Sequence, residues 1–247
     1  MEAPTISVII PVHNEGEPVV PLLDAVFQEA TSPIEVLVVF DMPEDTTAPV
    51  LAQYAEREPR VHPTLNTYGL GPANAIRYGL DQASAPVAVV MMADGSDDPA
   101  QIEHLASLVA DDGAVIGAAS RYMKGGRQIG GPFIKRTLSR LAGLSLHLIG
   151  RVGTHDATNS YKAYSTAFVT AVGVDSDQGF EIGIELVAKA KRARLPVAEI
   201  PTTWRDRSAG ESRFRVLAWI PHYLKWYLHA LGPARRLDLS AGRRARP

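Results

Sequence analysis

Cysteine is missing from this chain of 247 residues, so it has neither a disulfide framework nor a thiolate nucleophile. The sequence also lacks an apolar run of the roughly 20 residues that a membrane-spanning helix needs. No basic segment followed by an apolar stretch opens the chain, so its start does not resemble a secretory leader. From these absences we expect a cytoplasmic protein.

An excess of charge of one sign is missing as well. The chain has 25 basic and 27 acidic residues, for a net charge of −2, so we expect no nucleic-acid partner. Charge is concentrated in the C-terminal tail, where a set of arginines accompanies the single Asp238. These arginines are Arg235, Arg236, Arg243, Arg244 and Arg246. Because a chain of this length can bury a full core, we expect one domain with an appendage.

Apolar runs that end at turn residues alternate with segments whose apolar residues recur at helical spacing. The predicted strands are residues 5–11, 34–40, 61–65, 87–92, 115–120 and 197–203, with a loop followed by a strand in 150–164. The predicted helices are residues 19–27, 48–58, 69–83, 99–109, 135–149 and 181–194. This alternation predicts an α/β fold whose mainly parallel sheet is covered by helices on both faces.

The strand predicted at 87–92 stops abruptly at an acidic turn that contains Asp94, Asp97 and Asp98. Ligands of an open α/β sheet bind beyond the carboxyl ends of its strands. Carboxylates at that place can hold a hard divalent cation against a phosphate. Asp98 directly precedes Pro99, which is the pattern of a helix cap. We therefore assign a metal site to Asp94 and Asp97.

Glycine patterns argue against two other nucleotide-binding folds. The glycine fingerprint of a dinucleotide fold follows the first strand, whereas Gly69-Leu70-Gly71 follows the third predicted strand and lacks the third glycine. The sequence also contains no Gly-x-x-x-x-Gly-Lys phosphate loop. Neither a dehydrogenase nor a P-loop enzyme is therefore indicated.

A series of short motifs, taken in order, resembles family 2 glycosyltransferases of the GT-A fold. The motifs are SVIIPVHNE at 7–15, GLG at 69–71, ADGS at 93–96 with Pro99, SRY at 120–122, DATNSY at 156–161, and DR at 206–207 with GES at 210–212. The chain is most similar to the branch of dolichol- or polyprenyl-phosphate mannose synthases. The resemblance implies a GT-A catalytic domain at 1–212. From the residue pattern that follows it we expect an amphipathic helix at 213–233 and a basic, disordered tail at 234–247.

The resemblance also implies roles for individual residues. A group near the nucleotide would comprise Pro11, His13, Glu15, Asp41, Gly71 and Ala93. Arg121 and Arg207 would lie near phosphates, and Asp94 would bind Mg²⁺ or Mn²⁺ against the diphosphate. Further candidates for the phosphate and the acceptor are Lys135, Arg136, Thr158, Asn159, Ser160 and Arg213. Divalent ions and arginines suit this reaction because the departing nucleoside diphosphate develops negative charge.

Two positions depart from the family pattern. Phe40-Asp41 stands where paired aspartates are usual after the second strand, which removes one carboxylate expected to read the base or ribose. Met92 replaces the first aspartate of the Asp-x-Asp turn, and a thioether is too soft a ligand for Mg²⁺. The identity of the donor and the strength of metal binding therefore stay open.

Asp156 bears on the class of acceptor. In relatives that glycosylate a hydroxyl, an aspartate in this part of the fold acts as general base, whereas a polyprenyl phosphate is already an anion and needs none. We expect an inverting transferase that moves a hexose of the mannose or glucose class from a nucleotide diphosphate sugar to a polyprenyl or dolichyl phosphate. The alternatives are transfer to a soluble hydroxyl with Asp156 as base, and a degenerate protein that binds nucleotide sugars without turnover.

The segment after Arg213 carries an apolar and aromatic stripe at helical spacing, with cations among its members. The stripe consists of Phe214, Leu217, Ala218, Tyr223, Leu224, Tyr227, Leu228 and Leu231. Such a helix can lie in a membrane interface, where the basic tail would favour anionic lipid. It can equally pack on the catalytic domain. The first interpretation predicts a peripheral protein at the inner face of the membrane.

Overall fold

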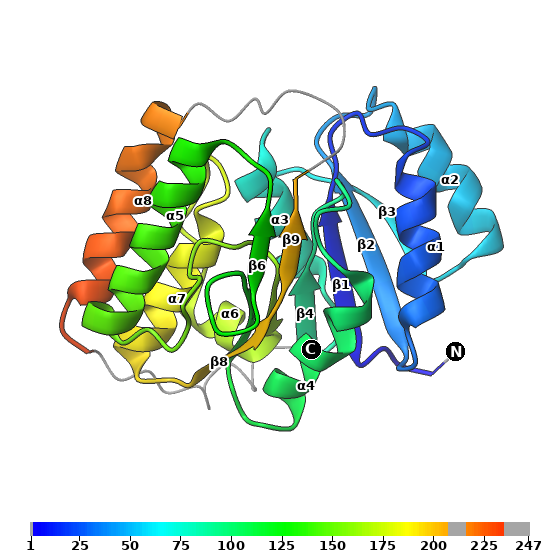
Figure 1. Ribbon diagram of the computed structural model, residues 1–247. Coiled ribbons are helices and arrows are strands. Elements are labelled where there is room, and N and C mark those ends of the chain that lie inside the picture. Colours follow the sequence, from blue (N-terminus) through cyan, green and yellow to red (C-terminus); the bar gives the residue numbers. More distant parts are fainter. Residues whose placement is uncertain (1, 207–215, 235–247) are drawn as a thin grey trace.

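Seven strands form the central sheet of the computed structural model, which describes residues 2–206 and 216–234 (Figure 1). The strands are β1 (Ile6–Pro11), β2 (Ile34–Phe40), β3 (Val61–Leu65), β4 (Val87–Val90), β5 (Ile116–Ser120), β7 (Lys162–Ser165) and β8 (Val197–Pro201). Their order is β3-β2-β1-β4-β7-β5-β8, and only β7 runs antiparallel to its neighbours β4 and β5 among these strands. A small parallel sheet joins β6 (Arg127–Ile129) to β9 (Thr203–Arg205). The predicted α/β architecture with a mainly parallel sheet is confirmed.

The helices cover both faces of the central sheet. They are α1 (Val19–Glu29), α2 (Thr47–Arg57), α3 (Pro72–Gln82), α4 (Ile102–Ala110), α5 (Phe133–Ser145), α6 (Thr166–Val172), α7 (Ile182–Ala193) and α8 (Val216–Leu231), with a 3₁₀ turn η1 (Pro99–Gln101) and a π-helix η2 (Leu146–Gly150). Residues of α1, α2 and α4 pack on one face, and residues of α3, α6, α7 and α8 pack on the other. Two layers of helices therefore bury the sheet completely at its centre.

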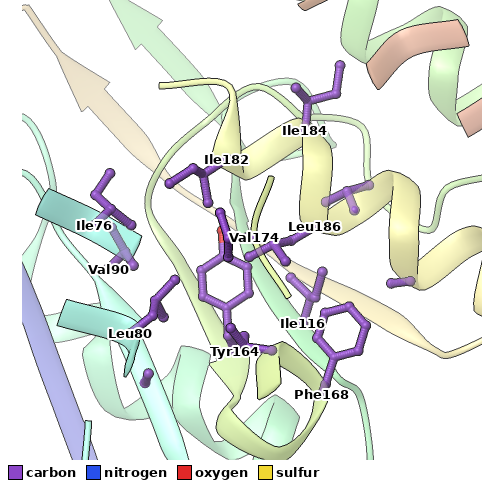
Figure 2. Close-up of a cluster of buried hydrophobic side chains, with 14 of the residues drawn as sticks. Ile76, Leu80, Val90, Ile116, Tyr164, Phe168, Val174, Ile182, Ile184 and Leu186 are labelled. Carbon is purple, nitrogen blue, oxygen red and sulfur yellow. The ribbon is translucent and has the colours of Figure 1, made fainter. Parts of the chain in front are cut away.

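Strand alternation explains the two cores. In β1, Val8 and Ile10 enter the core beneath α1, whereas Ile9 enters the opposite core beneath α3. Figure 2 shows Tyr164 and Phe168 in this second core, surrounded by aliphatic side chains from β5, α3 and α7. All six residues of β1 are buried, which is why its apolar residues are not confined to alternate positions.

Several elements differ from the sequence prediction. The strand predicted at 87–92 ends at Val90, and the residues after it belong to the turn that carries the site. Both α6 and β6 escaped prediction because they contain too few residues to show a period. The helix predicted at 135–149 is present as α5 continued by η2.

Some sequence predictions lie outside the described residues. Arg207 and Arg213 are in the segment 207–215, and residues 235–247 of the basic tail predicted at 234–247 are also outside the description. The side chain of Lys135 is likewise outside the description. Within residues 2–206 and 216–234, no helix combines the length and the apolar content needed to cross a bilayer.

Candidate active site

Hydrogen bonds tie the loop after β1 to the acidic turn after β2. The N–H of Asn14 donates to Asp45 at 2.9 Å, and the N–H of Glu15 donates to the hydroxyl of Thr47 at 3.0 Å. Burial alone would raise the pKa of Asp45, but hydrogen bonds from Thr47 and Asn14 hold that pKa below its usual value. Glu15 and the exposed His13, both predicted at the nucleotide site, therefore stand on a loop that is held in place.

Asp41, which directly follows β2, holds the glycine loop between β3 and α3. One of its oxygens accepts the N–H of Gly71 at 2.7 Å, and the other accepts the side-chain amide of Asn66 at 2.9 Å. Asn66 is buried and also donates to the carbonyl of Gly69 at 2.6 Å. Gly71 adopts a φ of 105°, which a residue with a side chain rarely permits. The structure thus brings Asp41 and Gly71 together, and Asn66 escaped prediction because it belongs to no motif.

The turn after β4 carries the carboxylates that were predicted to bind metal. Asp97 is 6% exposed and accepts the N–H of Met92 at 3.0 Å. Burial raises the pKa of Asp97 to about 7, although the hydrogen bond from Met92 lowers it. The neighbouring negative charge of Asp94 adds to the rise. Asp98 instead caps the N-terminus of η1 with its side chain, as its place before a proline predicted.

Asp94 and Asp97 line one cavity together with Met92, and this donor set can be compared with the needs of a metal ion. Mg²⁺ keeps several waters and is commonly bound through one or two carboxylates together with substrate phosphates. In the described part of the chain, no three His, Asp or Glu side chains are grouped so as to hold a metal. The two aspartates therefore fit a divalent ion that is shared with a bound diphosphate.

A buried ion pair joins the end of β5 to the loop before β7. Nε of Arg121 lies 2.6 Å from Oδ2 of Asp156, and Nη2 lies 2.9 Å from Oδ1. The backbone N–H of Arg121 donates to the same carboxylate at 3.1 Å. Asp156 is 0% exposed, and the side chain of Arg121 is 10% exposed where it faces the cavity. Arg121 is therefore held in one orientation by two parallel bonds.

This environment decides what Asp156 can do. Burial alone would raise its pKa, but the charge and hydrogen bonds of Arg121 hold the pKa of Asp156 below its usual value. The same pairing raises the pKa of Arg121, although burial opposes the rise. Asp156 also accepts the N–H of Asn159 and the hydroxyl of Thr158, each at 3.2 Å. A carboxylate engaged in this way is a poor general base.

Helix α5 is connected to this ion pair through Ser139. The Ser139 hydroxyl accepts a hydrogen bond from Nη2 of Arg121 at 3.2 Å and lies 2.6 Å from the hydroxyl of Thr158. The phenol of Tyr122 donates to it at 3.0 Å. Three elements that are distant in the sequence thus meet at one hydroxyl. Neither Ser139 nor Tyr122 was predicted as a site residue. A serine on a helix gives no signal in the sequence, whereas Tyr122 belongs to the SRY motif at 120–122.

A cavity of about 740 Å³ lies beside this network and has a polar and an apolar part. Its polar lining includes Asp94, Asp97, Arg121, Arg136, Thr158, Asn159 and Ser160, all of them predicted as site residues. Its apolar lining includes Leu138, Leu141 and Ala142 of α5 and Ile220, Tyr223, Leu224 and Tyr227 of α8. The predicted nucleotide group of Pro11, His13, Glu15, Asp41, Gly71 and Ala93 lies outside this lining, and Asp156 lies behind Arg121.

Helix α8 forms one wall of the cavity because it is packed on the catalytic domain. The indole N–H of Trp226 donates to Ser176 at 3.0 Å, and the phenol of Tyr227 donates to Ser145 of α5 at 2.9 Å. Figure 1 shows α5 and α8 side by side at one end of the molecule. Leu224 and Leu228 on α8 remain 48% and 58% exposed. One face of α8 is therefore packed on the catalytic domain, as the second interpretation of this helix predicted, and another face is exposed.

Comparison of the sequence with known proteins identifies related enzymes. The profile of Glycosyl transferase family 2 matches residues 7–171. The chain is 32% identical to the polyprenol monophosphomannose synthase of Mycolicibacterium smegmatis, over 86% of this chain and 85% of the relative. It is 31% identical to the undecaprenyl-phosphate mannosyltransferase of Micrococcus luteus, over 83% of this chain and 85% of the relative. It is also 30% identical to the dolichol-phosphate mannosyltransferase of Pyrococcus furiosus, over 90% of this chain and 64% of the relative.

Comparison of the structure with solved structures identifies the fold. The glucosyl-3-phosphoglycerate synthase of Mycobacterium tuberculosis, crystallised with Mn²⁺, UDP and glucosyl-3-phosphoglycerate, superimposes with a TM-score of 0.66. The match covers 94% of this chain and 81% of that protein, at 17% sequence identity. The predicted GT-A fold is thereby confirmed.

The Arg121–Asp156 pair yields a prediction about stability. Asp156→Asn should lower the free energy of unfolding by about 3–5 kcal/mol, because it leaves the buried charge of Arg121 uncompensated. Urea denaturation measures the change. Asp98→Asn is the matched control and should shift stability by less than about 1 kcal/mol, because asparagine also caps helices well. If Asp156→Asn were as stable as the wild type but lost catalysis, the carboxylate would be a catalytic base instead.

Proposed function

Because the chain belongs to glycosyl transferase family 2, we propose that this glycosyltransferase moves a hexose from a nucleotide diphosphate sugar to a polyprenyl phosphate, with inversion at the anomeric carbon. The observation that carries the proposal is the division of the cavity. Its polar part places carboxylates and arginines around a space for phosphate groups, and its apolar part continues between α5 and α8. A phosphorylated lipid has the same two parts.

The polar part of the cavity suits a reaction between two phosphate-bearing substrates. Asp94 and Asp97 stand on the turn after β4, where the diphosphate of the donor would arrive from the nucleotide group at β1 and β2. Arg121 and Arg136 line the same cavity, and a planar guanidinium can bind phosphate oxygens through two parallel bonds. The donor and the acceptor phosphate would therefore meet in the region bounded by these four side chains.

We further propose that a divalent ion binds together with the donor. Mg²⁺ or Mn²⁺ held by Asp94, Asp97 and the diphosphate would supply Lewis-acid stabilisation of the leaving nucleotide. Arg121 needs no metal to act, since its orientation is fixed by Asp156. Met92 would contribute no ligand, because thioethers bind hard cations poorly.

The acceptor proposed here requires no general base. A phosphate monoester carries negative charge at neutral pH and can attack the anomeric carbon in line. Asp156, the residue that transfer to a hydroxyl would use, has both of its oxygens engaged with Arg121 and the loop that follows. The geometry of Asp156 therefore supports a phosphate acceptor over a hydroxyl acceptor.

The apolar part of the cavity opens toward a surface that suits a membrane. In the described residues, ten large apolar side chains on α5, η2 and α8 are between 41% and 73% exposed. They are Phe133, Ile134, Leu138, Leu141, Leu148, Ile149, Ile220, Leu224, Leu228 and Leu231. Residues 132–151 and 216–231 contain no Asp or Glu but do contain Lys135, Arg136, Arg140, Arg151 and Lys225. We propose that this surface lies on an anionic bilayer from which the lipid acceptor enters.

An activity assay tests the proposed reaction. The purified protein, Mn²⁺, a panel of labelled nucleotide diphosphate hexoses and undecaprenyl phosphate should give a labelled product that extracts into organic solvent. Asp94→Ala should lower the rate on the order of a hundredfold or more if the carboxylate acts on developing charge. Asp98→Asn is the control and should keep the wild-type rate, because Asp98 caps η1.

Two results of this assay would contradict the proposal. Binding of a nucleotide sugar without transfer to any acceptor would identify a binding protein. Transfer to a soluble alcohol in preference to undecaprenyl phosphate would identify a hydroxyl acceptor.

Vesicle binding tests the proposed membrane surface. Replacing Leu148 and Ile149 together by glutamate should lower partitioning onto phosphatidylglycerol vesicles by at least about tenfold, because burying each apolar side chain contributes about 1.5–3 kcal/mol. Flotation through a density gradient measures the bound fraction. Leu65→Glu on the distant strand β3 is the control and should bind as the wild type does. Unchanged binding of both the double variant and Leu228→Glu would place the membrane contact elsewhere.

A further inference from the structure

Lys162, at the first position of β7, lies in the middle of the central sheet. It is 0% exposed, and its register partners are Val90 on one side and Ala118 on the other. A lysine is rarely buried so completely, because removing its charge from water is costly. The reaction as described so far gives this ammonium group no role.

The ammonium group of Lys162 binds the backbone of the loop that lines the cavity. Nζ donates to the carbonyl of Ala157 at 3.3 Å and to the carbonyl of Asn159 at shorter range. Between and beside these carbonyls stand Thr158 and Ser160, which line the polar part of the cavity. One buried cation therefore fixes the backbone on both sides of Thr158.

The first turn of α7 is shaped to admit this arrangement. A Cβ added to Gly183 would lie 2.9 Å from the carbonyl oxygen of Asn159 and 3.3 Å from Nζ of Lys162. Both distances are tighter than ordinary van der Waals contact, so a larger residue would push the loop or the ammonium group. Gly183 thus lets α7 approach the place where the lysine and the loop meet.

Two acidic side chains partly offset the cost of burying this ammonium group. Two carboxylates, Asp97 and Asp156, are buried in this region, and Arg121 is the other cation beside them. Burial lowers the pKa of Lys162 to about 7, while the charges of Asp156 and Asp97 oppose that fall. With Lys162 protonated and Asp97 ionised, the charges of these four groups sum to zero, which reduces the cost of burying them together.

We propose that Lys162 is a positioning residue for the acceptor, because its ammonium group holds the carbonyls of Ala157 and Asn159 and thereby places Thr158 and Ser160 against the acceptor phosphate. This inference rests on the proposed function. Donor-binding residues at β1 and β2 belong to other loops, so their contacts with a nucleotide sugar would be unaffected. The loss of the lysine should therefore affect the acceptor more than the donor.

The test compares Lys162→Met with Lys189→Met. Lys189 also bonds two backbone carbonyls, those of Val172 and Gly173, and its side chain is 10% exposed, but it does not line the cavity. Lys162→Met should raise the KM for undecaprenyl phosphate on the order of tenfold, since two buried carbonyls lose their donor. The KM for the nucleotide sugar should stay within about twofold of the wild-type value. Lys189→Met should lower stability and leave both KM values unchanged.

A second variant and a binding measurement cover the other outcomes. Gly183→Ala keeps the lysine but presses on the carbonyl of Asn159, so it should also weaken binding of the acceptor. Lys162→Arg keeps a positive charge and N–H donors, so it should lose less acceptor binding than Lys162→Met. Calorimetric titration with a short-chain prenyl phosphate measures acceptor binding without turnover. Equal acceptor binding by the wild type, Lys162→Met and Gly183→Ala would overturn the proposal. A wild type that shows no transfer, but binds the prenyl phosphate more tightly than these variants, would overturn the proposed function alone.

Discussion

The rest of the site depends on the ion pair between Arg121 and Asp156. A buried pair of this kind is stable only when the geometry is good and the remaining hydrogen-bonding capacity is used. Here the carboxylate also accepts bonds from Thr158 and Asn159, and the guanidinium also reaches Ser139. The end of β5, the loop before β7 and helix α5 are therefore fixed relative to one another. Removing either charge would leave its buried partner uncompensated.

The regions proposed for the two substrates are built in different ways. On the side proposed for the nucleotide, Asp41, Asp45 and Thr47 accept hydrogen bonds from backbone N–H groups, which hold the loops in place. On the side proposed for the acceptor, hydrogen-bonded polar groups stand at one end of a cavity whose other walls are apolar residues of α5 and α8. A rigid polar end suits a phosphate that must be oriented, whereas apolar walls suit a flexible chain that only needs to leave water.

Met92 shows how the fold accommodates a departure from the family pattern. Its side chain lines the cavity where the family has a carboxylate, yet its backbone N–H binds Asp97 and keeps that acid beside Asp94. The turn therefore still presents two carboxylates to the cavity. The high pKa of Asp97 reflects burial beside another acid, and a bound cation would relieve that repulsion.

The sequence by itself determined the layered α/β fold and the acidic turns at the ends of its strands, because buried runs and turn residues are local signals. It also determined that Asp98 would cap a helix. The short elements β6 and α6 carried no such signal. Only the tertiary structure decided that Asp156 pairs with Arg121, that α5 and α8 line one cavity, and that Lys162 is buried against the carbonyls of Ala157 and Asn159. Each of these depends on contacts between segments far apart in the chain, and no local pattern records which distant side chain will share a buried space.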